Sequence, residues 1–147
     1  MECGLYYKMK YTPNNIISLQ PNEIFVFGAN KRGIHSAGAA RLALQWGAVM
    51  GQTGLMGQTY GLCTKDENIR TLSLSEIQKE VNIFFEVAKN NPDKTFLVTK
   101  IDCGLAGYSE VEIAPLFMEI YWDVKDGIIK NILLPKEFWE YLDSCHP

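Results

Sequence analysis

Short apolar runs and longer amphipathic stretches alternate along the chain. A continuous apolar run, with no polar position on either side, is typical of a strand buried between two layers. Ile24–Phe27 is such a run, and Thr95–Ile101 is a second, mainly apolar segment. Shorter patterns of the same kind predict four more strands, at Leu5–Tyr11, Ile16–Leu19, Thr59–Thr64 and Ile128–Leu134.

Helices are expected between these strands. Ala37–Trp46 is rich in alanine and leucine, and Gly47 after it suits the left-handed conformation that often ends a helix. Two more helices are expected to begin at Ser73 and Ser109, because each serine has a glutamate three residues later and can form a capping box. A last helix is expected at Lys136–Asp143.

This alternation predicts an α/β fold, with residues 1–147 forming one domain in which a mixed sheet is flanked by helices. The 47% apolar and 21% charged residues are ordinary for a soluble globular protein. No apolar stretch reaches the length needed to span a bilayer. The first residues lack the basic and apolar pattern of a signal peptide, so we expect a cytoplasmic location.

Charge and cysteine usage narrow the possible partners. The net charge is −3, and Lys31–Arg32 is the longest basic cluster, so neither nucleic acid nor a membrane is expected as a partner. The four cysteines are far apart and form no CxxC pair, so neither a metal site nor a disulfide framework is expected. No cofactor is expected, and the oligomeric state stays open.

A glycine-rich loop follows each of the two main strands. Glycine lets the backbone approach a ligand closely, and the N-terminus of a following helix can hold an anion. The first loop is neither a Walker A nor a GxGxxG motif, so ligand binding and a simple tight crossover are both open. Its candidate ligand-binding residues are Gly28, Asn30, Gly33, His35, Ser36, Ala37 and Gly38.

Two side chains of the first loop have more than one possible role. The carboxamide of Asn30 can bind a sugar hydroxyl or can close a turn of its own loop. His35 can contact a phosphate or act as a general base, and the alternative is a solvent-exposed loop residue.

The second loop, Asp102–Ser109, is a stronger indication of a phosphate site. A strand, a glycine turn and a capped helix in succession can direct main-chain amides at a diphosphate. Asp102 can accept from a ribose hydroxyl, act as a base or cap the turn, and Tyr108 can stack on a ring or wedge the loop against the core. The candidate ligand-binding residues are Asp102, Cys103, Gly104, Leu105, Ala106, Gly107 and Tyr108.

Four motifs together resemble the macrodomain superfamily, in particular the short macro-like proteins of phages and prophages. They are Phe25–Asn30, Gly33–Ala40, Gly57–Tyr60 running into Thr64-Lys65, and Cys103–Tyr108 followed by Ile113-Ala114-Pro115. The resemblance implies a three-layer sandwich that binds ADP-ribose at the carboxyl ends of its strands. It also implies that Asn30 contacts the distal ribose and that the two loops contact the diphosphate.

Three functions follow from these observations. The leading one is a protein that binds ADP-ribose or a related ADP-ribose-derived nucleotide, and the resemblance implies that it captures an immune or stress signal in the host cytoplasm during phage infection. The second is an ADP-ribosyl hydrolase in which Asp102 or His35 activates water. The third is an interaction protein in which the glycine loops are only architectural.

Overall fold

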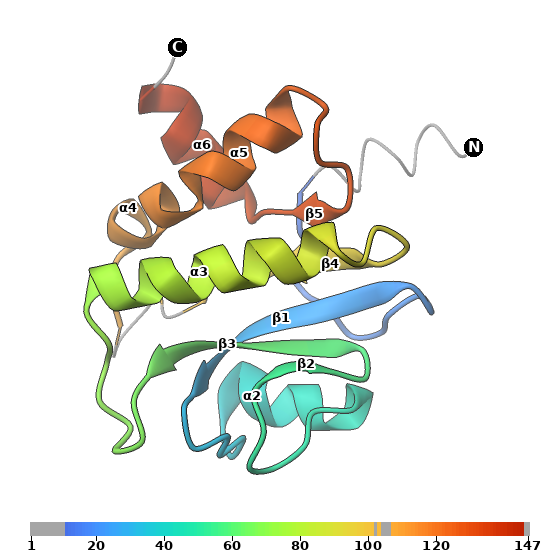
Figure 1. Cartoon of the computed structure of the whole chain (residues 1–147), viewed down its shortest axis with the longest axis vertical. Coiled ribbons are helices and arrows are strands. Elements are labelled where there is room, and N and C mark those ends of the chain that lie inside the picture. The colour runs from blue at the N-terminus through green and yellow to red at the C-terminus, as the bar shows by residue number, and fades with distance from the viewer. Residues whose placement is uncertain (1–10, 102, 104–106, 146–147) are drawn as a thin grey trace.

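The computed structural model describes residues 11–101, 103 and 107–145, which form a mixed α/β fold (Figure 1). Five strands make one sheet in the order β2-β3-β1-β4-β5. Central strand β1 is parallel to both of its neighbours, β4 is parallel to β5, and β2 is antiparallel to β3. The strands are β1 (Glu23–Asn30), β2 (Gly54–Met56), β3 (Thr59–Lys65), β4 (Thr95–Val98) and β5 (Ile132–Leu133).

Helices cover both faces of this sheet (Figure 1). They are α2 (Gly38–Ala43) with the 3-10 turn η1 (Leu44–Trp46), α3 (Leu74–Lys89), α4 (Glu110–Ile113), η2 (Ala114–Phe117), α5 (Met118–Lys125) and α6 (Lys136–Cys145). No helix in the described part of the chain is long and apolar enough to cross a bilayer.

The alternation of side chains along β1 separates two hydrophobic clusters. Phe25 and Phe27 point to the face covered by α2, where they pack with Ala43 and Met56. Ile24 and Val26 point to the opposite face and belong to the cluster that includes buried residues of α3, η2, α5 and α6. The predicted mixed α/β sheet is therefore confirmed, and its arrangement is compatible with a three-layer sandwich.

The helix ends follow the predicted local chemistry. Ser73 and Glu76 form the expected capping box, in which the Glu76 backbone N–H donates to Ser73 Oγ at 3.2 Å and the Ser73 backbone N–H donates to Glu76 Oε1 at 3.1 Å. Gly47 has the expected left-handed conformation, with φ 112°. The helix expected over Ala37–Trp46 is α-helical only as far as Ala43, and the 3-10 turn η1 follows it.

Several predicted strands are shorter or absent. Ile16–Leu19 is not a strand, and Leu5–Tyr11 lies outside the described residues except for Tyr11, which forms an isolated bridge with Leu134. The strand expected over Ile128–Leu134 is reduced to β5. The reason is that the backbone N–H groups of Ile128 and Ile129 both donate to the carbonyl of Asp123 and so close the end of α5.

Candidate functional site

The two glycine-rich loops begin at adjacent strands. The chain leaves β1 toward α2 on one face of the sheet, and it leaves β4 toward α4 on the other face, which α3 also covers. Loops that diverge in this way leave a crevice beyond the carboxyl ends of the strands, and ligands of open α/β sheets bind at such switch points.

A cavity of about 470 Å³ occupies this position. It is bounded by the ends of β1, β3 and β4 and by the start of α2. The lining residues are Gly28, Ala29, Asn30, Ile34, Ser36, Ala37, Ala39, Ala40, Thr64, Lys65, Ile69, Thr99, Lys100 and Ile101. We call this space the switch-point cavity.

The polar lining of the switch-point cavity favours an anion. Lys65 and Lys100 are the charged residues of the described lining, which contains no carboxylate. Lys100 is held in place by two acids on neighbouring helices, with its Nζ 3.7 Å from Glu110 Oε2 and 3.6 Å from Glu137 Oε2. Neutral hydrogen-bonding groups come from Asn30, Ser36, Thr64 and Thr99.

Asn30 has the turn-closing role, and it also lines the cavity. Its Nδ2 donates to the carbonyl of Ile34 at 2.9 Å, and its Oδ1 accepts from the Ile34 backbone N–H at 3.1 Å. Each half of the carboxamide can form one more hydrogen bond, because the amide nitrogen carries two hydrogens and the oxygen two lone pairs. The contact with a ribose therefore stays a prediction that this geometry permits.

His35 points away from the switch-point cavity and is not an exposed loop residue. The side chain is only 1% exposed, and its Nε2 lies 3.0 Å from the carbonyl oxygens of both Val49 and Gln52. Its ring packs edge-on against Phe27. The His35 side chain therefore contacts the segment before β2 and holds the first loop against it. In this geometry the imidazole does not point toward a ligand in the cavity.

Gly33 also allows the first loop to pack against the segment before β2. Its φ is 71°, and a Cβ at this position would clash with the backbone of Gly51 and Gln52. The Gly51 backbone N–H donates to the Gly33 carbonyl at 2.8 Å. Gly28, Ser36 and Ala37 line the cavity as candidate ligand residues, whereas Gly33 and Gly38 do not.

The second loop is described only in part. Asp102, Gly104, Leu105 and Ala106 lie outside the described residues. Cys103 and Tyr108 form an isolated bridge, and the Tyr108 hydroxyl donates to the carbonyl of Leu72 at 2.7 Å. Cys103, Gly107 and Tyr108 do not line the switch-point cavity, so their ligand contacts stay predictions.

The turn after β3 supplies a lining residue that sequence patterns did not indicate, Ile69. The carboxylate of Asp66 accepts from the backbone N–H groups of Asn68 at 2.8 Å and Arg70 at 3.0 Å. These bonds, that from Arg70 above all, lower the pKa of the Asp66 carboxyl below its usual value. Lys100 was also missed, although it interrupts the apolar pattern at the end of a strand.

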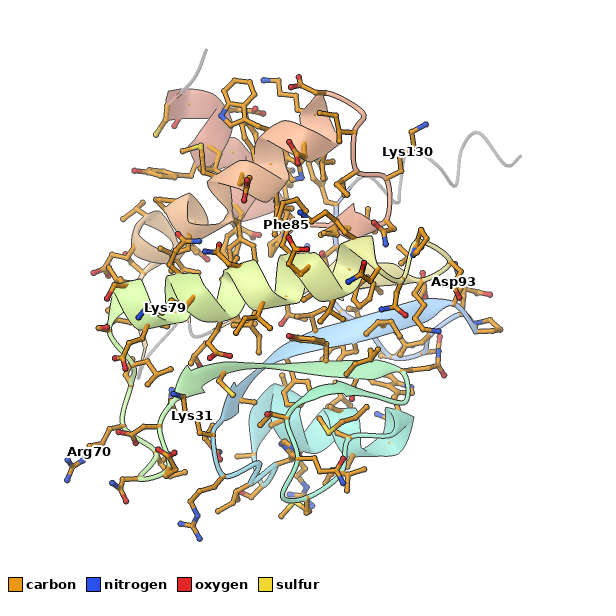
Figure 2. All side chains as sticks on the ribbon, in the orientation of Figure 1. Lys31, Arg70, Lys79, Phe85, Asp93 and Lys130 are labelled. Carbon is orange, nitrogen blue, oxygen red and sulfur yellow. The ribbon has the colours of Figure 1, made fainter. Side chains whose placement is uncertain are left out.

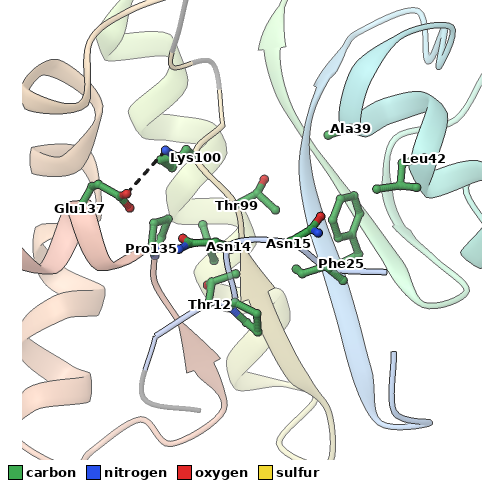
Figure 3. Close-up of a pocket in the computed structure, with 13 residues that line it drawn as sticks. Thr12, Asn14, Asn15, Phe25, Ala39, Leu42, Thr99, Lys100, Pro135 and Glu137 are labelled. Carbon is green, nitrogen blue, oxygen red and sulfur yellow. Dashed lines mark ion pairs between the residues drawn. The ribbon is translucent and has the colours of Figure 1, made fainter. Parts of the chain in front are cut away.

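A second cavity of about 290 Å³ adjoins the first and shares Ala39, Thr99 and Lys100 with it. Figure 3 shows the side chains of Asn14 and Asn15 beside Thr99, with the ion pair between Lys100 and Glu137 at one side. The other lining residues are Thr12, Pro13, Ile16, Phe25, Leu42, Val98 and Pro135. The three shared residues therefore border both cavities.

No protein-family model, curated protein or solved structure matches this chain. The macrodomain resemblance therefore rests on the sequence motifs alone. Within the described residues, no group of three or more histidine, cysteine, aspartate or glutamate side chains could hold a metal ion.

Proposed function

We propose that this protein binds ADP-ribose or a related ADP-ribose-derived nucleotide in the switch-point cavity. One observation carries the proposal. The cavity lies where the loops after β1 and β4 diverge, and its described lining carries two lysines and no carboxylate. A dianionic diphosphate suits such a lining, because charge-assisted hydrogen bonds to lysine are stronger than neutral ones.

The size and polarity of the site support the same class of ligand. Small-molecule sites commonly measure about 300–1,000 Å³, and the switch-point cavity falls in this range before its neighbour is added. The carboxamide of Asn30 and the hydroxyl groups of Ser36 and Thr64 are suitable partners for ribose hydroxyls. The adjoining cavity offers space for a second part of an elongated nucleotide.

Binding is favoured over hydrolysis by the residues that the structure describes. Activation of water requires a base within hydrogen-bond reach of the reacting centre. Among the described residues, no histidine, aspartate or glutamate lines the switch-point cavity, and the Nε2 of His35 lies against two backbone carbonyls. We therefore propose capture of the nucleotide without cleavage.

Isothermal titration with ADP-ribose, with AMP and ribose 5-phosphate as shorter ligands, tests this proposal. We expect saturable binding of ADP-ribose that Lys65→Ala weakens roughly tenfold, the effect of losing one charged hydrogen bond. Lys130→Ala is the matched control, because Lys130 is exposed and lies at the far end of the molecule from Lys31 and Arg70 (Figure 2).

Two results would overturn the proposal. The first is the absence of binding by the wild-type protein at millimolar ADP-ribose. The second is an equal loss of affinity in Lys65→Ala and Lys130→Ala, which would place the ligand elsewhere. Chromatography of the nucleotide after incubation separates capture from cleavage, since capture returns it intact.

A further inference from the structure

Ile69 has a backbone conformation that isoleucine rarely adopts. Its φ is 62°, and it is the only non-glycine residue with positive φ among those that the structure describes. The left-handed region crowds the Cβ of any L-residue, and a β-branched side chain suffers most. Strained residues of this kind gather at ligand sites, so the position needs an explanation in function or in packing.

The surrounding turn imposes this conformation. Asp66 accepts from the backbone N–H groups on both sides of Ile69, those of Asn68 and Arg70. The Ile69 N–H donates to the Asp66 carbonyl at 3.1 Å, and the Asp66 N–H donates to the Arg70 carbonyl at 2.8 Å. Asparagine or glycine would fit this turn with less strain than isoleucine.

Packing within the protein does not account for the isoleucine. Its side chain is 46% exposed, and it belongs to neither of the two hydrophobic clusters. It does line the switch-point cavity, next to the chain segment that supplies Lys65. The apolar side chain thus stands open to the cavity beside a cationic group.

We propose that Ile69 is a specificity-determining residue that packs on the apolar face of a ring of the bound nucleotide. The inference rests on the function proposed above and deepens it. Lys65 attracts the phosphate groups of the ligand, whereas the apolar side chain of Ile69 favours ligands that carry a ring next to those phosphates. The strained turn holds this side chain at the cavity before the ligand arrives, so little side-chain ordering is required on binding.

Two variants and a matched control test the inference by titration with ADP-ribose and by thermal unfolding. Ile69→Asn fits the turn but removes the apolar surface, so we expect an affinity about fivefold lower with an unchanged or higher melting temperature. Ile69→Leu keeps an apolar side chain and is expected to bind within about twofold of wild type. Ile128→Asn removes a more exposed isoleucine, 68% exposed on the loop after α5, and is expected to leave the affinity unchanged.

Wild-type affinity in Ile69→Asn would overturn the inference. So would an equal loss in Ile69→Asn and Ile69→Leu, because the shape of the turn and not the apolar contact would then be responsible. A lower melting temperature with unchanged affinity in Ile69→Asn would assign the residue to packing alone. Failure of the wild-type protein to bind ADP-ribose is a separate result, seen before any variant is made, and it overturns the proposed function together with this inference.

Discussion

Thr99 donates two hydrogen bonds to the carbonyl of Val26, one from its backbone N–H at 3.3 Å and one from its hydroxyl at 2.7 Å. Thr99 is the first residue after β4, and Val26 lies in the middle of β1. The pair therefore joins the end of β4 to the middle of β1, and Thr99 itself lines both cavities.

Replacement of Thr99 by valine is expected to weaken the contact between β4 and β1. Thr99→Val removes the hydroxyl but keeps the shape and the backbone hydrogen bond, so we expect a loss of about 1 kcal/mol in the free energy of unfolding. We also expect weaker ADP-ribose binding, because Thr99 lines both cavities. Urea unfolding and titration measure the two effects.

Thr95→Val is the matched control for this prediction. Thr95 opens the same strand at its amino end, away from both cavities. We expect it to leave nucleotide affinity unchanged. Equal binding by Thr99→Val and wild-type protein would show that the threonine hydroxyl serves the sheet alone.

His35 is expected to act on stability and not on turnover. His35→Leu removes the Nε2 donor that lies 3.0 Å from the carbonyl oxygens of Val49 and Gln52, so we expect a loss of about 1 kcal/mol in unfolding free energy. His35→Gln can still donate to a carbonyl and should recover part of that loss. Denaturant unfolding of both variants measures the difference.

A role of His35 in water activation would give another result. Cleavage of ADP-ribose by the wild-type protein that both His35 variants abolish, at unchanged stability, would restore the histidine as a catalytic residue. The present geometry predicts intact nucleotide in all three samples.

Tyr60 is expected to make the fold sensitive to alkali. Burial, followed by the charge of Glu80 and a smaller contribution from Cys63, raises the pKa of Tyr60 from 10.0 to about 12. Above pH 10 the unfolded chain loses this proton while the folded chain retains it. Stability is therefore unaffected by Tyr60 below about pH 10 and falls as the pH rises toward 12.

Denaturant unfolding between pH 8 and pH 11.5 measures this loss, whose upper limit is about 3 kcal/mol. Tyr60→Phe is the control, since the phenylalanine ring keeps the edge-on contact with Phe84 and cannot ionise. A wild-type pH profile parallel to that of Tyr60→Phe would contradict the prediction. Lysines titrate in both proteins, so only the difference between the profiles counts.

The fold was predictable from the sequence where one local pattern decides it. The continuous apolar run at Ile24–Phe27 predicts a strand covered on both faces, and it is the centre of the sheet. Strand β2 was not predicted, because the glycines at 51, 54 and 57 are typical of a loop, and all three do have positive φ. Ile128 and Ile129 were assigned to a strand, although their backbone N–H groups close a helix.

From the sequence, the candidate site was predictable only as two separate glycine-rich loops. Asn30 and Ser36 were found because they follow an apolar run within a glycine-rich segment. Lys100 and Ile69 were not found, because their place in the cavity depends on β3 and β4 lying on either side of β1. The contacts of His35 were not predicted, because its partners, Val49 and Gln52, belong to a later segment. Strand order and the direction of a side chain are set by distant contacts that no local pattern contains.

The junction of Thr99 with Val26 also has a consequence for folding. These residues are 73 positions apart, and β3 and α3 lie between them in the chain. Strands β1 and β4 can pair only after that long intervening segment has folded back. Contacts between residues so far apart in the chain form slowly during folding. A nucleotide that recognises the cavity would therefore bind only chains in which this step is complete. It would serve as a reporter of completed folding in refolding kinetics.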